Sequence, residues 1–336
     1  MRAAIKGGKE RFDIIEVDTP SPGPNECLVR IHYCAICVWC YREWLRDDTD
    51  QLYPPGLTGH EMSGVIEAVG DIVTDWKAGD RVLTYAASHC GECAECRAGR
   101  SSHCLQTKKA PSVLGGYAEY VSAHTNCLFP APDGIDLKEA SMITDMVGTP
   151  MHAIRRAFRL DLPKAAVGVW GLGPVGLFTV QGLRTYAEVG KIIALDPVGY
   201  RRELASGLGA DEVLDPLAEG ILDLLRKQND GQGMDYAFNC ALKNPQDAYD
   251  TLRKGGFLMN ITGGIKTQGE TDKTVDGTWY FDHSEYPANI DMVKAGKFDL
   301  AGGITHEFPL ADINTAFEVR AKHPEESLKV VIRCID

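Results

Sequence analysis

The sequence predicts an α/β protein with a β-rich domain and a second domain built on a doubly wound parallel sheet. Three observations carry this prediction. The chain of 336 residues has the length of about two domains of roughly 150 residues each. Its first third contains short β-branched runs between Pro/Gly stretches, which is typical of strands joined by loops. After residue 145 the pattern changes to strand, glycine turn and helix, the order found in parallel α/β folds.

The expected elements follow this division. In the first third, strands are predicted at residues 27–31 and 64–69. In the second part, continuous apolar runs predict parallel strands covered on both faces, at residues 166–170, 191–195, 234–238 and 256–261. The helical patterns between these strands span residues 200–208 and 218–227.

The end of the chain is expected to return to the first domain. A short helical pattern at residues 288–294 leads to a last apolar strand at residues 328–332. A lone strand needs a sheet to join, and the β-rich domain offers one. The predicted domains are therefore residues 1–145 together with 286–336, and residues 146–285.

Composition and charge exclude several classes of protein. Hydrophobic residues make up 44% and charged residues 24% of the chain, which excludes general disorder and a coiled coil. The 47 acidic and 35 basic residues give a net charge of −12, which argues against nucleic acid or an anionic membrane as the main partner. The first ten residues lack the apolar stretch of a secretory signal, so we expect a cytoplasmic protein.

A glycine-rich turn predicts a dinucleotide site. Residues Gly171, Gly173, Pro174, Val175 and Gly176 form a G-x-G-x-x-G turn between a predicted strand and a helical run. The glycines allow a tight turn, let the backbone approach a pyrophosphate and let the helix pack closely on the strand.

The acid that follows the next strand favours NAD over NADP. Asp196 lies 20 residues beyond Gly176, where a carboxylate accepts from the ribose hydroxyls and repels a 2′-phosphate. Arg201 is expected over the adenine or as a solvated arginine on the helix surface. A purely structural reading, with a glycine turn and a helix-capping Asp196, is the alternative.

A cysteine-rich loop predicts a structural zinc site. Of the 11 cysteines, four stand close together, at Cys90, Cys93, Cys96 and Cys104. Four thiolates wrap a tetrahedral ion and leave no open position, so the role would be structural. An iron–sulfur cluster and four free thiols are the alternatives.

A second metal site is indicated upstream. Gly59-His60-Glu61 follows a Cys34-Ala35-Ile36-Cys37 segment. Cysteine, histidine and a carboxylate are the ligand types of a catalytic zinc that keeps one position open.

In order and type, these motifs make the chain similar to the zinc-dependent medium-chain alcohol/polyol dehydrogenase family, in the sorbitol, threonine and secondary-alcohol dehydrogenase branch. The C-x-I-C segment, the G-H-E-x-x-G motif, the four-cysteine loop and the G-x-G-x-x-G turn cover both predicted domains. The resemblance implies a GroES-like zinc domain at residues 1–145 and 286–336, and a Rossmann NAD-binding domain at residues 146–285.

The resemblance also implies a ligand set. It makes Cys37 and His60 ligands of the catalytic zinc and places Glu61 close by as an exchanging carboxylate, with Glu61 or a water as the fourth ligand. Asp145 matches the position of the third protein ligand in relatives. Its alternative role is a helix cap.

One segment departs from the family. Relatives usually follow the ligand cysteine with Gly-Ser/Thr-Asp, and this hydroxyl passes the substrate proton toward solvent. Here Val-Trp-Cys-Tyr follows Cys37, so Tyr41, a bound water or Glu61 is expected to carry the proton. Trp39 is expected to place a large apolar surface beside the zinc.

The cysteines that flank Cys37 at equal spacing, Cys34 and Cys40, are extra ligands or buried free thiols.

The predicted function is hydride transfer between NAD and a secondary alcohol, such as a polyol, cyclitol, sugar or hydroxy amino acid. Zinc would lower the pKa of the alcohol and the Rossmann domain would hold the nicotinamide. The alternatives are a non-catalytic NAD- and zinc-binding regulatory protein, and an NADPH-dependent aldehyde reductase, which Asp196 disfavours. The resemblance implies a homodimer or homotetramer.

Overall fold

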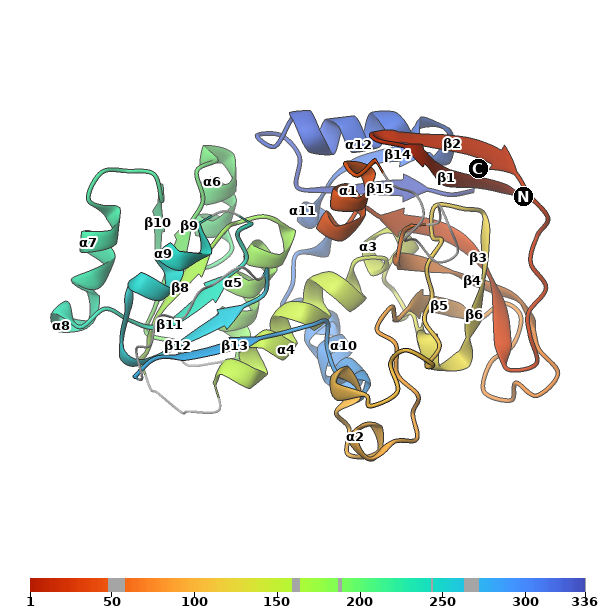
Figure 1. Cartoon of the computed structure of the whole chain (residues 1–336), viewed down its shortest axis with the longest axis horizontal. Helices are drawn as coiled ribbons and strands as arrows, with labels where there is room; N and C mark the ends of the chain where they lie inside the picture. The colour runs from red at the N-terminus through yellow and green to blue at the C-terminus, as the bar shows by residue number, and fades with distance from the viewer. Residues whose placement is uncertain (48–57, 159–163, 187–188, 243, 263–271, 336) are drawn as a thin grey trace. The chain divides into compact units, whose positions relative to one another are not determined.

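The computed structural model describes residues 1–47, 58–158, 164–186, 189–242, 244–262 and 272–335 (Figure 1). The chain forms two compact units. Unit 1 contains Met1–Asp145, Asp282–Tyr286 and Asp299–Asp336, and unit 2 contains Met146–Phe281 and Pro287–Phe298.

The domain boundaries proposed from the sequence stay a prediction, and Pro287–Phe298 groups with unit 2. Two contacts within unit 2 explain this grouping. Arg155 Nη2 donates to Asn289 Oδ1 at 2.8 Å, and the ring of Phe298 stacks on Phe178.

Unit 1 is built on a seven-stranded sheet. Its strand order is β14-β15-β3-β4-β5-β7, and β6 also pairs with β3. All pairs are antiparallel except β14 with β15. The strands are β3 (Glu26–Ala35), β4 (Glu61–Val69), β5 (Arg81–Thr84), β6 (Tyr120–His124), β7 (Leu128–Pro130), β14 (Ile304–Pro309) and β15 (Lys329–Arg333). A separate antiparallel pair consists of β1 (Arg2–Gly8) and β2 (Arg11–Glu16).

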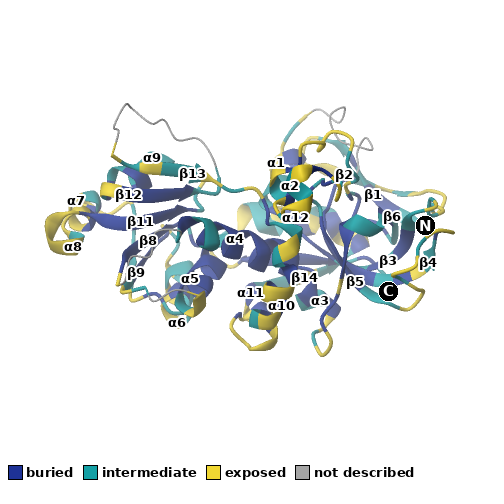
Figure 2. Ribbon diagram, turned by 90° about the horizontal axis from the view of Figure 1, so that it is seen from below, coloured by how far each residue is buried: buried dark blue, intermediate teal, exposed yellow. Residues whose placement is uncertain are grey.

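The last strand joins the first part of the chain, as expected. In β15, Val331 pairs with Ala35 and Ile332 with Cys34, both at the end of β3. Figure 2 shows the inner strands of this sheet in the colour of buried residues. This pairing brings the start of β15 to the same end of the sheet as the start of β4.

Short helices complete unit 1. They are α1 (Val38–Trp44), α2 (Ala94–Arg97), α3 (Leu137–Ala140), α11 (Leu300–Gly303) and α12 (Ile313–Lys322), with 3₁₀ turns at Ser101–His103, Thr125–Cys127, His283–Glu285 and Leu310–Asp312. Helix α12 buries Ile313, Ala316 and Phe317. The ring of Phe317 lies 4.8 Å from Phe12 and 5.6 Å from Trp44, so α12 holds the β1–β2 pair and α1 in one core.

Unit 2 contains a six-stranded parallel sheet in the order β10-β9-β8-β11-β12-β13. The strands are β8 (Ala166–Trp170), β9 (Lys191–Leu195), β10 (Glu212–Leu214), β11 (Met234–Asn239), β12 (Leu252–Asn260) and β13 (Thr274–Gly277). In chain order this is 3-2-1-4-5-6, the order of the Rossmann fold, in which nucleotides bind at the carboxyl ends of the strands. The predicted α/β fold class is therefore confirmed.

The helices of unit 2 include those expected, with shifted ends. They are α4 (Gly148–Ala157), α5 (Pro174–Tyr186), α6 (Gly199–Gly207), α7 (Ile221–Arg226), α8 (Gln228–Gly231), α9 (Pro245–Asp250) and α10 (Tyr286–Lys294). The helix predicted from residue 218 begins only at Ile221, because Gly220 has a left-handed conformation with φ 73°. Among the described residues, no helix is long and apolar enough to cross a membrane.

Candidate functional sites

Four of the predicted site residues meet in unit 1. Cys37, His60, Glu61 and Asp145 are buried, and one ligand atom of each lies within 4.8 Å of those of the others. Cys37 is the N-cap of α1, His60 immediately precedes β4, and Glu61 is the first residue of that strand. Asp145 lies in a π-helical turn, Ile143–Val147. Such turns are rare in proteins overall, but those that do occur are often found at functional sites.

A glycine fixes the turn before His60. Gly59 has a φ of 93°, a left-handed conformation that side chains disfavour. A Cβ atom at this position would also lie 3.1 Å from the backbone nitrogens of Gly116 and Tyr117. The Thr84 hydroxyl donates to the His60 carbonyl at 3.0 Å and secures the backbone on the other side. The position of His60 is therefore set by backbone geometry.

The distances between the donor atoms suit a metal ion. Asp145 Oδ2 lies 3.4 Å from Cys37 Sγ and 3.8 Å from His60 Nε2. Zinc binds sulfur at about 2.3 Å and nitrogen at about 2.0 Å, so neighbouring ligands of a tetrahedral zinc lie about 3.5 Å apart. The three donor atoms therefore fit zinc in spacing and in type.

The charges of the cluster also suit a divalent cation. Lys329 Nζ lies 2.6 Å from Glu61 Oε1 and 2.5 Å from Oε2, with both side chains almost fully buried. When ionised, Cys37, Glu61 and Asp145 carry three negative charges, and Lys329 balances one of them. The two that remain equal the charge of one Zn²⁺ ion.

Without a cation, Cys37 and Glu61 resist ionisation, whereas the pKa of Asp145 is lowered, because hydrogen bonds to His60 and Glu61 outweigh the effect of burial. Burial, with the nearby Asp145 carboxylate, raises the pKa of the Cys37 thiol to about 12. Burial also raises the pKa of Glu61 to about 8, although the Lys329 ammonium acts in the opposite direction. A bound metal supplies the positive charge that favours the thiolate and the carboxylates.

The structure separates the two aromatic residues of the predicted site. The Trp39 ring lies 5.6 Å from the His60 ring at an angle of 58°, so an apolar surface does border the cluster. The Tyr41 ring instead contacts Trp44 and the guanidinium of Arg320, at 5.9 and 5.6 Å. Trp39 therefore borders the cluster, whereas the ring of Tyr41 packs against Trp44 and Arg320.

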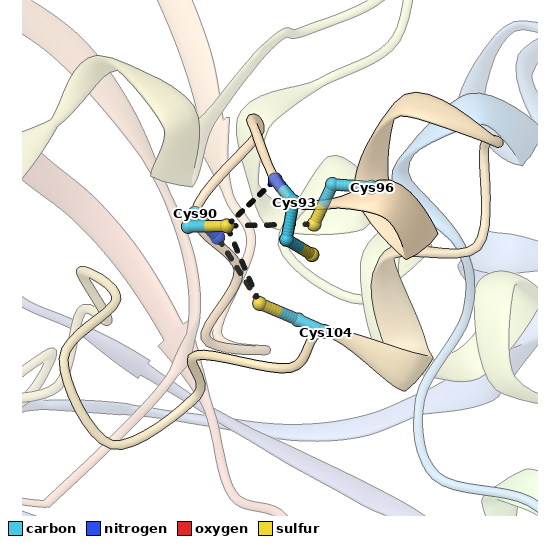
Figure 3. Close-up of side chains that lie close together, drawn as sticks. All are labelled: Cys90, Cys93, Cys96 and Cys104. Carbon is cyan, nitrogen blue, oxygen red and sulfur yellow. Dashed lines mark hydrogen bonds between the residues drawn. The ribbon is translucent and has the colours of Figure 1, made fainter.

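The four cysteines of the loop also converge, as Figure 3 shows. Cys90 Sγ lies 3.9 Å from Cys96 Sγ and 3.7 Å from Cys104 Sγ. These separations exceed the roughly 2.05 Å of a disulfide and match the roughly 3.8 Å between two sulfurs on one tetrahedral zinc. All four cysteines are free of disulfide bonds.

Backbone amides support these sulfurs. The N–H of Cys93 donates to Cys90 Sγ at 3.3 Å, and those of Cys90 and Gln106 donate to Cys104 Sγ at 3.4 Å. Bonds of this kind favour the thiolate form, which is the form that binds a metal. Backbone hydrogen bonds to the sulfur of Cys93 lower the pKa of that thiol to about 6. The loop therefore fits a structural zinc.

The glycine turn lies between β8 and α5, and its three glycines have different surroundings. Gly171 has a φ of 85°, and a Cβ there would lie 2.8 Å from the backbone of Ala241. A Cβ at Gly176 would lie 1.9 Å from the Gly171 carbonyl oxygen, so this glycine allows close packing of helix on strand. A Cβ at Gly173 would meet no atom within 4 Å. That open space lies at the start of α5, where Pro174 and Val175 begin the helix and where a pyrophosphate would bind.

Asp196 follows β9 and faces the same turn. Its Oδ2 accepts from the N–H of Leu172 at 2.7 Å and its Oδ1 from the N–H of Val198 at 2.8 Å. The Nη1 atom of Arg201 lies 3.9 Å from the Asp196 carboxylate. Each carboxylate oxygen has lone pairs left for the hydroxyls of a ribose.

Some residues near these sites were not predicted. Lys329 is the first residue of β15 and precedes three apolar residues, which is the signal that was available in the sequence. Asn239, at the end of β11, donates to Asn260 Oδ1 and Thr262 Oγ1 at 2.8 and 2.9 Å. The Thr262 hydroxyl in turn donates to the carbonyl of Ala241, which packs against Gly171. Polar residues that end apolar parallel strands are the signal for such positions.

Comparisons with known proteins agree with these sites. Residues 23–133 match the alcohol dehydrogenase GroES-like domain family, and residues 174–295 match the zinc-binding dehydrogenase family. An L-threonine 3-dehydrogenase of Rhizobium johnstonii is 31% identical over 99% of this chain and 98% of its own length. The sorbitol dehydrogenase of Bacillus subtilis is 28% identical over 99% of this chain and 97% of its own length.

A solved structure shows the same fold. The cobalt- and zinc-bound thermostable alcohol dehydrogenase of Pyrobaculum aerophilum is 25% identical, with a TM-score of 0.84 over 99% of both chains. Domain families that together cover more than half of the chain, full-length relatives and two metal-ligand clusters lead to one conclusion. The chain belongs to the zinc-dependent medium-chain alcohol/polyol dehydrogenase family.

Proposed function

We propose that the protein oxidises a secondary alcohol, and reduces the corresponding ketone, with NAD as the hydride carrier. The substrate class is a polyol, cyclitol, sugar or hydroxy amino acid. One observation carries this proposal. A buried Cys37, His60 and Asp145 donor set with zinc spacing occurs in the same chain as a glycine turn with an open cradle at Gly173. A protein that held zinc only for its fold would need neither this second donor set nor the glycine turn.

In this proposal Cys37, His60 and Asp145 hold the catalytic zinc. When bound, zinc supplies Lewis acidity that lowers the pKa of an alcohol hydroxyl. Glu61 stays nearby with its charge balanced by Lys329, so it reaches the metal only by weakening that ion pair. Trp39 excludes water from one side and limits the size of the substrate, because its ring borders His60.

The cofactor is held by unit 2. The backbone of Gly171, Gly173 and Gly176, with Pro174 and Val175 at the amino end of α5, receives the pyrophosphate. Asp196 accepts hydrogen bonds from the adenosine ribose. Its carboxylate repels a 2′-phosphate, which favours NAD over NADP. Arg201 lies beside that carboxylate and contributes a cationic edge to the same region.

The four-cysteine loop holds a second, structural zinc. Cys90, Cys93, Cys96 and Cys104 use all four positions of a tetrahedral ion, so no position is left for substrate. A homodimer or homotetramer is the proposed assembly.

The experiment is NAD reduction by zinc-loaded protein across polyols, cyclitols, sugars, simple secondary alcohols and threonine. Each assay is repeated with NADP and after removal of metal by a chelator. Chelator-sensitive turnover of one substrate class with NAD supports the proposal. Turnover only with NADPH and aldehydes would replace it by the reductase alternative. Binding of NAD and two zinc ions without turnover of any substrate would favour a non-catalytic regulatory protein.

A further inference from the structure

A buried thiol stands beside the proposed zinc ligands without belonging to the donor set. Cys40 lies in the first turn of α1, three residues after Cys37, and its side chain has no exposed surface. Residues three apart on a helix share a face, so the turn that presents Cys37 also points Cys40 toward the cluster. The four residues whose ligand atoms lie within 4.8 Å of one another do not include Cys40.

Cys40 and the donor set face opposite edges of one imidazole. Cys40 Sγ lies 3.7 Å from His60 Nδ1, whereas Asp145 Oδ2 lies 3.8 Å from His60 Nε2. A neutral imidazole has one N–H and one lone pair. If Nε2 gives its lone pair to the metal, Nδ1 carries the hydrogen and donates to the Cys40 sulfur.

The sulfur faces a polar atom although it is buried. The Cys40 side chain has no exposed surface, and His60 Nδ1 lies within hydrogen-bond distance of a sulfur acceptor. A cysteine retained only for apolar packing would not need to place its sulfur against a ring nitrogen.

We propose that Cys40 is a positioning residue whose sulfur accepts the Nδ1–H of His60, so that Nε2 is presented to the zinc. Metal-bound histidines commonly donate their other N–H to a carboxylate or carbonyl, and loss of that partner weakens metal binding about 10- to 100-fold. Here a thiol takes that role. The inference rests on the proposed zinc role of His60.

The test compares Cys40→Ala, Cys40→Ser and Cys40→Asp with wild type. Cys34→Ala is the matched control, because Cys34 flanks Cys37 at the same spacing, is equally buried, and hydrogen-bonds the carbonyl of Ala35 rather than His60. Zinc affinity is measured by competition with a chelator. The Nδ1 proton of His60 is followed by NMR on ¹⁵N-histidine-labelled protein, and the thiolate charge-transfer band is recorded on cobalt-substituted protein.

We expect Cys40→Ala to weaken binding of the proposed catalytic zinc about 10- to 100-fold and to shift the His60 Nδ1–H signal. Cys40→Asp should recover most of the affinity, and Cys34→Ala should match wild type. The charge-transfer intensity of cobalt at the proposed catalytic site should stay that of one thiolate, Cys37, in every Cys40 variant that binds cobalt there. Should Cys40→Ala fail to fold, the Ser and Asp variants provide the same comparison of weak and strong acceptors.

Equal zinc affinity in Cys40→Ala and Cys34→Ala would overturn the inference and leave the proposed function intact. A fall in charge-transfer intensity on Cys40→Ser would overturn it differently, by making Cys40 a ligand. If wild type held only the zinc of the four-cysteine loop, the proposed function itself would fail, and the role of Cys40 with it.

Discussion

Lys329 and Glu61 form a buried ion pair that joins the last strand of the chain to the motif that contains His60. The Nζ atom lies 2.6 Å from Glu61 Oε1, and the side chains are 2% and 0% exposed. The two residues are 268 positions apart in the sequence. The pair therefore links closure of the sheet in unit 1 to the charge balance of the proposed zinc site.

Loss of one member of this pair should destabilise the protein strongly. Lys329→Met leaves Glu61 buried without its cation, and breaking a buried pair in this way costs about 3–5 kcal/mol. The double variant Lys329→Met/Glu61→Gln should regain part of the loss, because no buried charge is then unpaired. Urea unfolding of the zinc-loaded proteins measures both changes. A single variant as stable as wild type would show that the pair has no such role.

The glycine turn offers a test that separates cofactor binding from folding. Gly173→Ala adds a methyl group in open space, so the free energy of unfolding should change little. The same methyl group would occupy the approach of the pyrophosphate, so NAD should bind at least about 10-fold more weakly.

Gly176→Ala is the contrasting variant. Its Cβ would lie 1.9 Å from the Gly171 carbonyl oxygen, so helix α5 must shift and the fold should lose stability. Thermal unfolding and NAD titration of both variants test these two predictions. Equal NAD affinity in Gly173→Ala and wild type would contradict the proposed pyrophosphate site.

The choice of cofactor should depend on Asp196. Asp196→Ala removes hydrogen bonds to a carboxylate, worth about 1.5–3 kcal/mol, so kcat/KM for NAD should fall about 10- to 100-fold. The value for NADP should fall less or rise, because the repulsion of the 2′-phosphate is lost. Asp215→Ala is the control, since Asp215 is a partly exposed acid beside Arg202 in the same unit. An unchanged NAD/NADP ratio would exclude Asp196 from cofactor selection.

The cysteine loop should contribute to stability rather than to chemistry. Cys104→Ser removes one of four thiolates, so we expect one zinc fewer per chain and a lower temperature of unfolding. Metal analysis and calorimetry of the purified variant measure these changes. A full zinc complement in this variant would argue against the four-cysteine assignment.

The sequence predicted those parts of the fold whose signals are local. Strands β8 and β9 were predicted with the bounds observed, because they are continuous apolar runs covered on both faces. The edge strands β10 and β13 contain only three and four residues, and no residue in either is fully buried, so no pattern marked them. Their conformation depends on pairing with β9 and β12.

The site shows the same limit. The types and spacing of Cys37 and His60 allowed the proposed donor set to be predicted, and the structure brings both residues together with Asp145. The role of Lys329 depends on a pairing that closes the sheet late in the chain. Which nitrogen of His60 faces Cys40 depends on the left-handed turn at Gly59 and the start of α1. Neither follows from residue types alone.

The most direct test of the account is the zinc content and NAD-linked turnover of Asp145→Ala beside wild type. Wild type should hold two zinc ions per chain and lose turnover when the proposed catalytic zinc is removed. Asp145→Ala should retain the zinc of the four-cysteine loop, lose most of the other zinc, and lose turnover by at least about 100-fold. Two tightly bound zinc ions and full turnover in Asp145→Ala would contradict the assignment of the catalytic metal site.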